Sequence, residues 1–570
     1  MSHPKNLKEI DLTPIPGKKY TSIEREWREE FIYFLMVDRF HDDQVRQPHL
    51  GPDRSRGVMT PDNEFYGGKI KGITQNLDYI AGLGCTAIWL SPVFVNNEGA
   101  YHGYNINNYL DIDPHFGTKQ DLIDLVDAAH NYQKNGQPHP IRIILDVVIN
   151  HSGDNWSYPG GFEYHYCNDQ QFPFGFWRPD REPFPEELRN EGFYHRKGNM
   201  SNYDAPPENL HGDMCGLKDY AHDEGDPWES EVINTLIKIH AYWIKETDVD
   251  GFRVDAIKHM GAVACSRFCS NIREYAYSLG KHGFFLFGEL AVPDDDIVDR
   301  YIGPNTSARD KQTVFFGIDS VLDFPLAEGK YNDPNQRPLR DVLKGFDGPE
   351  TLFQRLEAQH HRALNRGEIG RYLVTFIDNH DSFWQPGRFS AGAPDEQVIG
   401  AVGFLLCALG TPCLYYGTEQ GFEGKGSDNG MREAMFDTAK PGVNLLNTDC
   451  RIYQTIGEMA SIMRTIQPLR FGRMYYRQIS GDGVNFGFPY GTTYTLAFSR
   501  ILYPTEVLVA YNVSGQPRQD CIIVDAALHA AGDKMAYLYG KSGTVDVQES
   551  PGGARYVQLN LTPYQFVILK

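Results

Sequence analysis

The sequence lacks the features of a membrane-embedded or exported protein. No apolar run approaches the length of a membrane span, and the N-terminal stretch MSHPKNLKEIDLTPIPGKKY has no apolar core of the kind that a signal peptide needs. The nine cysteines are odd in number and show no paired spacing, which is typical of free thiols in a reducing compartment. We therefore expect a cytoplasmic protein, or a secreted one if a leader was removed.

Positive charge is also scarce. Lysine and arginine together number 54 against 75 aspartates and glutamates, which gives a formal net charge of −21. This balance argues against nucleic acid or an anionic membrane surface as a partner. The chain shows no internal repeat and no low-complexity linker, and nothing in it specifies an oligomeric state.

Short apolar stretches alternate with helical ones along most of the 570 residues, a length that exceeds the usual size of one domain. Residues 231–247, EVINTLIKIHAYWIKET, repeat apolar side chains at helical spacing. Eight strands are predicted, over residues 31–37, 86–92, 141–148, 250–255, 284–289, 320–325, 372–378 and 412–417. Eight strands that alternate with helices predict an α/β fold, a (β/α)8 TIM barrel.

Two regions break this alternation. Residues 151–222 are rich in glycine, proline and aromatic residues and are too long for an ordinary loop, so we expect an inserted domain after the third strand. After residue 471, alternating strands such as EVLVAYNV and PYQFVILK replace the helices, which predicts a C-terminal antiparallel β-sandwich. The expected domains are the barrel over 1–150, the insertion over 151–222, the barrel again over 223–471 and the sandwich over 472–570.

Three carboxylates follow predicted strands. In a barrel of this kind the functional groups lie at the carboxyl ends of the strands. Asp255 ends the fourth strand, Glu289 ends the fifth, and Asp381 follows the seventh. A single aspartate after a strand is usually a helix cap or a turn residue. Three such residues together, with histidines beside two of the sites, favour a catalytic centre.

The chain has no phosphate-binding loop, nicotinamide motif or Ser–His nucleophile pair, whereas glycosidic cleavage needs only two carboxyl groups. Arg253 shares a strand face with Asp255 because side chains alternate along a strand, and its charge would hold Asp255 ionised as a nucleophile. Glu289, which follows the apolar FFLF, would stay protonated as the general acid. Asp381 would stabilise the positive charge that develops on the sugar, or bind the sugar's hydroxyls.

An ordered set of motifs supports this interpretation. In chain order the sequence reads GLGCTAIWLSPV, AYHGY, DVVINH, GLKDY, GFRVDAIKH, GEL, FIDNHD and GTPCLYYGTE. With these motifs the chain resembles the α-amylase family, glycoside hydrolase family 13, over nearly the whole barrel. The resemblance implies Asp255 as nucleophile, Glu289 as acid/base and Asp381 as transition-state stabiliser of a retaining enzyme. Retention implies a separation of roughly 5–5.5 Å between the carboxyl groups of Asp255 and Glu289.

The resemblance also implies a set of substrate-binding residues: Tyr104, His102, His151, Arg253, Lys258, His259 and His380. Tyr104 would stack on the sugar at the cleavage point, whose apolar C–H faces suit an aromatic ring. His151 and His380 would bind hydroxyls of that sugar, and the pair Lys258–His259 would act on the leaving-group side. The aromatic residues of the insertion either line further subsites or build the core of that domain: Trp156, Tyr158, Phe162, Phe176 and Trp177.

Calcium is the cofactor that the resemblance implies. Its ligands would be the side chains of Asn150 and Asp219 and the backbone carbonyl of His259. Oxygen ligands from side chains and backbone suit Ca²⁺, which is a hard cation.

The resulting interpretation is an α-amylase-type enzyme that hydrolyses α-1,4 bonds in starch-like glucans or maltooligosaccharides. One alternative within the same family is a glucanotransferase, or a hydrolase of short or branched dextrins. A second alternative, from another class, is a non-catalytic glucan-binding or scaffold protein. The presence of all three carboxylates together with Arg253, His151 and His380 favours an enzyme.

Overall fold

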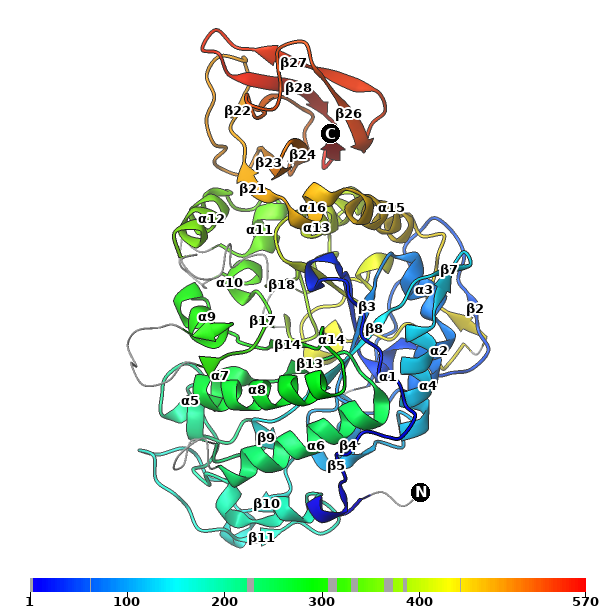
Figure 1. Ribbon diagram of the computed structural model, residues 1–570, viewed down its shortest axis with the longest axis vertical. Coiled ribbons are helices and arrows are strands. Elements are labelled where there is room, and N and C mark those ends of the chain that lie inside the picture. The colour runs from blue at the N-terminus through cyan, green and yellow to red at the C-terminus, as the bar shows by residue number, and fades with distance from the viewer. Residues whose placement is uncertain are drawn as a thin grey trace.

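The parallel strands of the computed structural model close into a barrel (Figure 1). The eight-stranded sheet has the order β17-β14-β13-β8-β3-β1-β19-β18, and a parallel bridge between Leu322 and Val374 joins its two ends. The strands are β1 (Ile32–Leu35), β3 (Ala87–Leu90), β8 (Arg142–Val147), β13 (Gly251–Val254), β14 (Phe285–Gly288), β17 (Ser320–Val321), β18 (Val374–Thr375) and β19 (Thr411–Tyr415). Each lies within or overlaps a predicted strand, so the predicted TIM barrel is confirmed.

The structure describes residues 4–61, 63–222, 230–305, 315–329, 337–362, 373–382, 387–440 and 442–570. Residue 372, where the seventh predicted strand starts, lies outside the described residues. So do residues 223–229, where the second part of the barrel was expected to begin.

The barrel strands are continuous apolar runs because both of their faces are covered. Every residue of β1, β3, β8, β13 and β14 is buried. The longer helices of the barrel are α4 (Lys119–His130), α6 (Glu231–Thr247), α8 (Ala262–Ser278), α12 (Glu350–Arg362), α13 (Asp395–Cys407) and α15 (Arg451–Thr465). The bounds of α6 match the predicted helix, which begins where the Ser230 side chain caps the backbone N–H of Ile233.

Shorter helices complete the connections between strands. They are α1 (Val37–Phe40), α2 (Ile70–Gln75), α3 (Leu77–Gly82), α5 (Glu208–His211), α7 (Ile257–Met260), α9 (Asp295–Tyr301), α10 (Phe324–Ala327), α11 (Leu339–Leu343), α14 (Asp428–Met431) and α16 (Gln467–Phe471). Of these, α7 directly follows β13 and α14 lies after β19, so both stand at the carboxyl ends of their strands.

The segment between β8 and α6 forms the inserted domain. Its strands are short: β9 (His151–Ser152), β10 (Trp156–Ser157), β11 (Phe176–Trp177) and β12 (Lys218–Asp219). The antiparallel pair β9–β12 places Asp219 opposite His151, directly after the end of β8. Trp156 and Tyr158 are buried in the hydrophobic core, whereas Phe162 and Phe176 are exposed. Trp156 and Tyr158 therefore build the core of the inserted domain, which is one of the two alternatives that the sequence left open.

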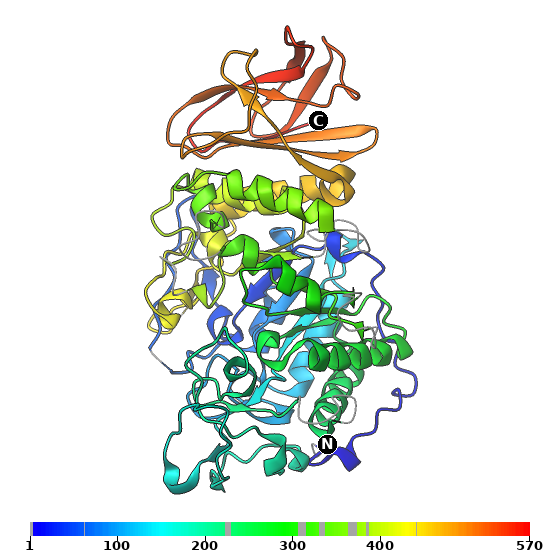
Figure 2. The same ribbon diagram turned by 90° about the vertical axis from the view of Figure 1, so that its left-hand side faces the viewer.

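The C-terminal part is a nine-stranded antiparallel sheet that packs against one side of the barrel, above α12, α13, α15 and α16 (Figures 1 and 2). Its strands are β21 (Arg473–Tyr476), β22 (Ile479–Ser480), β23 (Thr495–Leu502), β24 (Thr505–Asn512), β25 (Arg518–Ile523), β26 (Lys534–Tyr539), β27 (Thr544–Glu549), β28 (Arg555–Leu561) and β29 (Phe566–Leu569). The hydroxyl groups of Tyr494 and Tyr511 donate to the carbonyls of Val342 and Leu343, which fixes the sheet to α11.

All nine cysteines are free, and seven of them are buried. Among the described residues, no helix combines the length and the apolar character needed to cross a membrane.

Candidate active site

The strand register brings the first two charged residues of the site together. Arg253 on β13 lies opposite Asp146 on β8 and opposite Phe287 on β14. Asp255 and Glu289 follow one residue after the ends of β13 and β14, so both stand at the carboxyl end of the barrel. Parallel pairing of neighbouring strands therefore places Asp146, Asp255 and Glu289 around one guanidinium.

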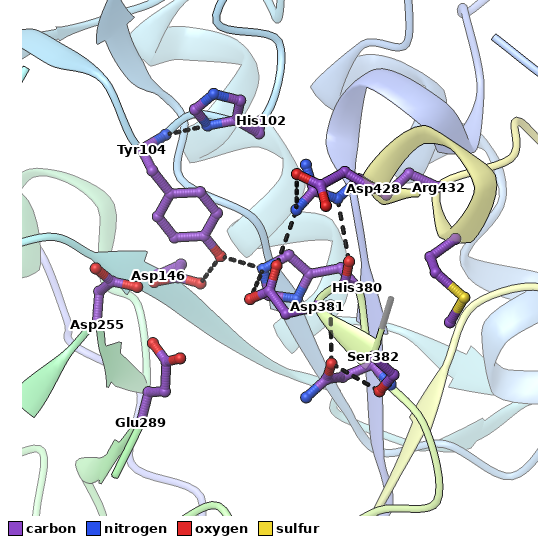
Figure 3. A network of polar contacts seen from close by, with 12 residues as sticks. His102, Tyr104, Asp146, Asp255, Glu289, His380, Asp381, Ser382, Asp428 and Arg432 are labelled. Atoms are coloured by element: carbon purple, nitrogen blue, oxygen red, sulfur yellow. Dashed lines mark hydrogen bonds and ion pairs between the residues drawn. The ribbon is translucent and has the colours of Figure 1, made fainter. Parts of the chain in front are cut away.

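The Arg253 guanidinium binds all three of these carboxylates. Its Nη1 donates to Asp255 Oδ1 at 2.6 Å and to Asp146 Oδ1 at 2.9 Å, and its Nη2 donates to Glu289 Oε2 at 2.7 Å. The Arg253 side chain is 1% exposed, and the same guanidinium lies over the rings of Trp89 and Tyr104. Contact with two nitrogens of one planar group holds Asp255 and Glu289 side by side, facing Asp146 and Tyr104 (Figure 3).

A second chain of polar contacts leads to Asp381. The Tyr104 hydroxyl donates to Asp146 Oδ2 at 2.9 Å and lies 3.0 Å from His380 Nε2, which is 3.1 Å from Asp381 Oδ2. The other carboxylate oxygen of Asp381 accepts from Arg432 Nη2 at 2.8 Å. Arg432 is itself fixed because it donates to the His380 carbonyl and to the Tyr101 hydroxyl. Asp381 thus has a defined orientation before any substrate binds.

Three rings lie nearly parallel beside these carboxylates. The Tyr104 ring is stacked with His380 at a centroid distance of 5.6 Å and with His102 at 5.8 Å. His102 also accepts the backbone N–H of Tyr104 through Nδ1. The described structure therefore brings together Tyr104, His102 and His380, as the sequence interpretation expected, on the side of the site that faces Asp381.

Burial governs the protonation of this site. It raises the pKa of Asp146 to about 6, although the Arg253 guanidinium acts in the opposite direction. Burial also raises the pKa of Asp255, with further increases from Glu289 and Asp146, again against Arg253. Three carboxyl groups with one guanidinium carry an excess of negative charge away from water, so the cluster favours keeping a proton.

The histidines of the site are neutral for the same reason. Burial lowers the pKa of His102 to about 3 and that of His151 to about 4, and it lowers the pKa of His380 further below its usual range, with Arg432 acting in the same direction. Within the described part of the chain, His151 Nε2 and His380 Nδ1 are buried without a hydrogen-bond partner. A neutral imidazole can both accept and donate a hydrogen bond, which suits sugar hydroxyls.

Lys258 and His259 stand apart from this network. Lys258 Nζ donates to Asp204 Oδ1 at 2.6 Å and to the Ala291 carbonyl at 3.1 Å, while the His259 ring bonds the Asn209 carbonyl. Both side chains therefore connect helix α7 to the inserted domain. The Ala291 contact lies two residues beyond Glu289, so this connection borders the site at its β14 side.

Two of the three predicted calcium ligands, Asn150 and Asp219, lie where β8 meets the inserted domain. Asn150 Nδ2 is 3.3 Å from Asp219 Oδ1, and Asp219 Oδ2 lies 2.5 Å from His195 Nδ1. Asn150 Oδ1 is fully buried and has no partner among the described residues. An unpaired oxygen beside a buried carboxylate fits a hard cation. Lys218 points away from this place, because it binds Asp213 and lies over the Trp156 ring.

The described residues contain no group of three or more His, Cys, Asp or Glu side chains that could hold a metal ion. The proposed calcium set is consistent with this finding because it relies on one carboxylate, one amide and one backbone carbonyl. His259, the third predicted ligand, lies on α7, and its ring is bonded to the Asn209 carbonyl of the inserted domain.

Two residues of the site were missed by the sequence interpretation. Asp146 is an acid inside an otherwise apolar strand, which is the same signal that singled out Arg253, and it opens the DVVINH motif. Arg432 follows α14 and carries no comparable signal, because an arginine in a loop is ordinary. Only the fold shows that this arginine reaches Asp381.

A barrel with an insertion after its third strand, a C-terminal antiparallel sheet and three carboxylates gathered at its strand ends defines the architecture of α-amylase-type proteins. The family profile "Alpha amylase, catalytic domain" matches residues 34–442. That match covers well over half of the chain, and the protein belongs to the α-amylase family.

The sequence identity to individual relatives is low. An α-amylase of Streptomyces lividans is 27% identical over 91% of this chain and 58% of its own length. A cyclomaltodextrin glucanotransferase of Klebsiella oxytoca is 27% identical over 78% of this chain and 66% of its own. The chain thus spans less than two thirds of both. The solved structure of CldA, described as the first cyclomaltodextrin glucanotransferase with a three-domain ABC distribution, is 26% identical with a TM-score of 0.67, covering 95% of this chain and 98% of that one.

Proposed function

We propose that this protein hydrolyses α-1,4-glucosidic bonds in starch-like glucans or maltooligosaccharides with retention of configuration. The observation that carries the proposal is the single Arg253 guanidinium bound by Asp255 through one nitrogen and by Glu289 through the other. Retaining glycosidases need two carboxyl groups only about 5–5.5 Å apart. Two carboxylates on the two terminal nitrogens of one planar group lie close together, which supports a separation of this kind.

The reaction assigns one role to each carboxyl group. Glu289 gives its proton to the leaving glycosidic oxygen while Asp255 attacks the anomeric carbon, so the glycosidic bond breaks and a covalent glycosyl–enzyme forms. Glu289, now ionised, takes a proton from water, and the resulting hydroxide displaces Asp255.

Asp381 and the stacked rings act on the sugar itself. Asp381, held by Arg432 and His380, would bind hydroxyls of the sugar at the cleavage point and stabilise the positive charge of the transition state. Tyr104 presents a ring on which the sugar's C–H face can stack. His151 and His380 would bind its hydroxyls.

Calcium has a supporting place in this proposal. Asn150, Asp219 and the His259 carbonyl would hold the ion, which would fasten the inserted domain to the end of β8. Bound there, the ion supplies structural stability and takes no part in the transfer of the sugar. Because β9 and β12 carry both His151 and Asp219, order at this junction helps to position His151.

A glucanotransferase is the second candidate function. The specific observation in its favour is the set of cyclomaltodextrin glucanotransferases among the relatives, one of which shares the three-domain plan. Hydrolysis and transfer differ only in whether water or a sugar hydroxyl takes the glycosyl group from Asp255, so the same carboxylates serve both reactions.

Product analysis over time tests this proposal. The parent protein and the Glu289→Gln variant are incubated with amylose, maltoheptaose, β-cyclodextrin and pullulan, and Glu549→Gln in the C-terminal sheet is the matched control. Hydrolysis predicts early maltooligosaccharides of mixed length from amylose, whereas transfer predicts products longer than the maltoheptaose supplied. Because the acid/base contributes about 10²–10⁴-fold or more, Glu289→Gln should lose turnover and keep binding.

Two results would contradict the proposed function. A Glu289→Gln variant that turns over as fast as the parent would show that Glu289 is not the acid/base. A correctly folded parent that binds maltoheptaose and releases no product would support the glucan-binding alternative instead.

A further inference from the structure

A cavity of about 290 Å³ lies on the flank of the barrel, outside the catalytic site. It is bounded by α9, α10 and α12, which lie one above the other along one side of the barrel in Figure 1. Its wall comes mainly from the loops that follow β14 and β17 and from the first turns of α12. The volume is close to the lower end of the range for small-molecule sites, so the cavity suits a small ligand.

One polar atom in the wall of this cavity lacks a partner. Thr351, at the start of α12, is 9% exposed, and its Oγ1 is buried without a hydrogen-bond partner among the described residues. Thr351 lines the cavity together with Gln354, whose amide can both donate and accept. Because a buried hydroxyl left unpaired is unfavourable, the wall favours a ligand that brings a hydrogen-bonding group.

The arginines of the wall are already paired with carboxylates. The Arg355 guanidinium donates to Asp295 at 2.8 and 3.1 Å and to Asp323 at 2.7 and 3.0 Å, and so ties the loop after β14 to the loop after β17. A second arginine of the wall, Arg337, lies 3.6 Å from Asp347. One guanidinium between two carboxylates leaves no surplus of positive charge, so the cavity does not favour an anion.

The same pairing disfavours a metal ion. Both carboxylate oxygens of Asp295 accept from Arg355, and Asp294 Oδ1 accepts the backbone N–H of Asp296 at the start of α9. A hard cation such as Ca²⁺ takes about six to eight oxygen ligands. The carboxylates that line the cavity are therefore too few and too occupied to hold one.

The rest of the wall is apolar. It is formed by Pro293, Pro325, Leu326, Leu352 and Ala358. A purely apolar ligand would nevertheless bury the Thr351 hydroxyl and the Gln354 amide without compensation. The cavity thus calls for a ligand with hydroxyl groups along its edge, C–H surface on its faces and no net charge, and sugars combine these three properties.

We propose that this cavity is a second binding site, specific for a neutral sugar of roughly one or two rings, either free or at the end of a longer chain. Thr351 and Gln354 bind its hydroxyls, Asp294 accepts from a further hydroxyl, and the proline and leucine side chains cover its C–H faces. The proposal goes beyond the hydrolysis proposed above, because the residues that line the cavity include no member of the catalytic site described here.

Calorimetric titration with maltose tests the site. The reference is Glu289→Gln, which removes turnover under the proposed function. Into this background we place Ala358→Trp, whose indole fills the cavity from an exposed position on α12, or the control Glu357→Trp, at a neighbouring exposed position that does not line the cavity. Ala358→Trp should bind one maltose fewer per chain than the reference, whereas Glu357→Trp should bind the same number. An equal number in a folded Ala358→Trp would overturn the proposal and leave solvent as the occupant.

A second variant keeps the test decisive if Ala358→Trp does not fold. Thr351→Val keeps the shape of the side chain and removes only the hydroxyl. The affinity of one maltose site should fall about 3- to 10-fold, as expected for the loss of one hydrogen bond between neutral groups. Unchanged affinity at every maltose site would overturn the proposal.

Two further ligands define the class and the source of the sugar. Phosphorylated glucose that binds the cavity more tightly than glucose would overturn the assignment to a neutral ligand. Maltoheptaose separates the two sources, and either result supports the site: loss of a binding site in Ala358→Trp with both maltoheptaose and maltose identifies chain ends, and loss with maltose alone identifies free short sugars.

Failure of this proposal can be told apart from failure of the proposed function. The measured quantity is the difference of one maltose between two variants, so it does not depend on how many sugars the catalytic site binds. A parent that neither hydrolyses nor transfers any glucan would overturn the proposed function, while the loss of one maltose in Ala358→Trp would still support the cavity as a sugar site.

Discussion

The amino end of the barrel carries a buried ionic network whose contribution to stability should depend on pH. His130, the last residue of α4, lies 2.8 Å from Asp250 and 3.5 Å from Asp248, and Lys281 Nζ binds both aspartates. The His130 side chain is 4% exposed. Burial opposes its protonation, but the two aspartates overcome this effect and raise the pKa of His130 to about 9.

The sign and size of the effect follow from linkage. A histidine whose pKa is about 9 when folded and 6.5 when unfolded stabilises the fold fully below pH 6.5, and this stability is lost as the pH rises through 9. The difference of about 2.5 units corresponds to about 3 kcal/mol. The pKa values of Asp248 and Asp250 are lowered by their partners, so both stay ionised throughout this window.

The assay is urea unfolding of the parent and of His130→Gln at pH 6 and pH 10. The variant should be less stable than the parent by about 3 kcal/mol at pH 6, whereas at pH 10 the loss of this charge should no longer lower its stability. The control is His139→Gln, because burial lowers the pKa of His139 to about 4. For this variant, the difference in stability from the parent should change between pH 6 and pH 10 by less than about 1 kcal/mol, and in the opposite direction. A gap between parent and His130→Gln that stays constant from pH 6 to pH 10 would refute the reasoning.

Two further predictions concern the catalytic end. Arg432→Lys should lower kcat/KM for maltoheptaose about 10- to 100-fold, since one ammonium cannot replace the three contacts that the guanidinium makes to Asp381, His380 and Tyr101; full activity would show that Asp381 needs no such support. If calcium binds at Asn150 and Asp219, millimolar Ca²⁺ at 100 times its Kd should add about 2.7 kcal/mol of stability over chelator-treated protein. The measurement is the melting temperature with Ca²⁺ and with chelator. The parent should melt at a higher temperature with Ca²⁺, and Asn150→Ala should melt at the same temperature in both. A parent that melts at the same temperature with Ca²⁺ and with chelator would argue against the site.

The barrel was predictable from the sequence because its strands are buried on both faces. A continuous apolar run such as IRIILDVV indicates a strand buried on both faces, and the apolar side chains at helical spacing in residues 231–247 indicate the helix α6. The carboxyl-end rule then selected Asp255, Glu289 and Asp381 without knowledge of any contact. These predictions rest on local patterns, which one chain shows directly. The cytoplasmic location stays a prediction from the sequence.

The contacts of the site were not predictable, because they depend on strand register and on loops that are distant in sequence. Arg253 was paired with Asp255 on the grounds of strand alternation, whereas the structure divides its guanidinium among three carboxylates. Asp146 is 107 residues away from Arg253 along the chain and opposite to it in the sheet. Arg432 reaches Asp381 only because α14 and the end of β18 converge. Pairing of this kind is a property of the closed barrel.

The two ends of the barrel use buried polar groups in different ways. At the amino end, His130, Lys281 and two aspartates satisfy one another, so their charges stabilise the fold without a ligand. At the carboxyl end, His151 Nε2, His380 Nδ1 and Asn150 Oδ1 are buried without a hydrogen-bond partner among the described residues. A buried polar atom left unpaired costs about 1–3 kcal/mol. A ligand with matching oxygens would recover that cost, so under the proposed function the stability that this end of the barrel gives up in the free protein would become binding energy for a sugar or a cation.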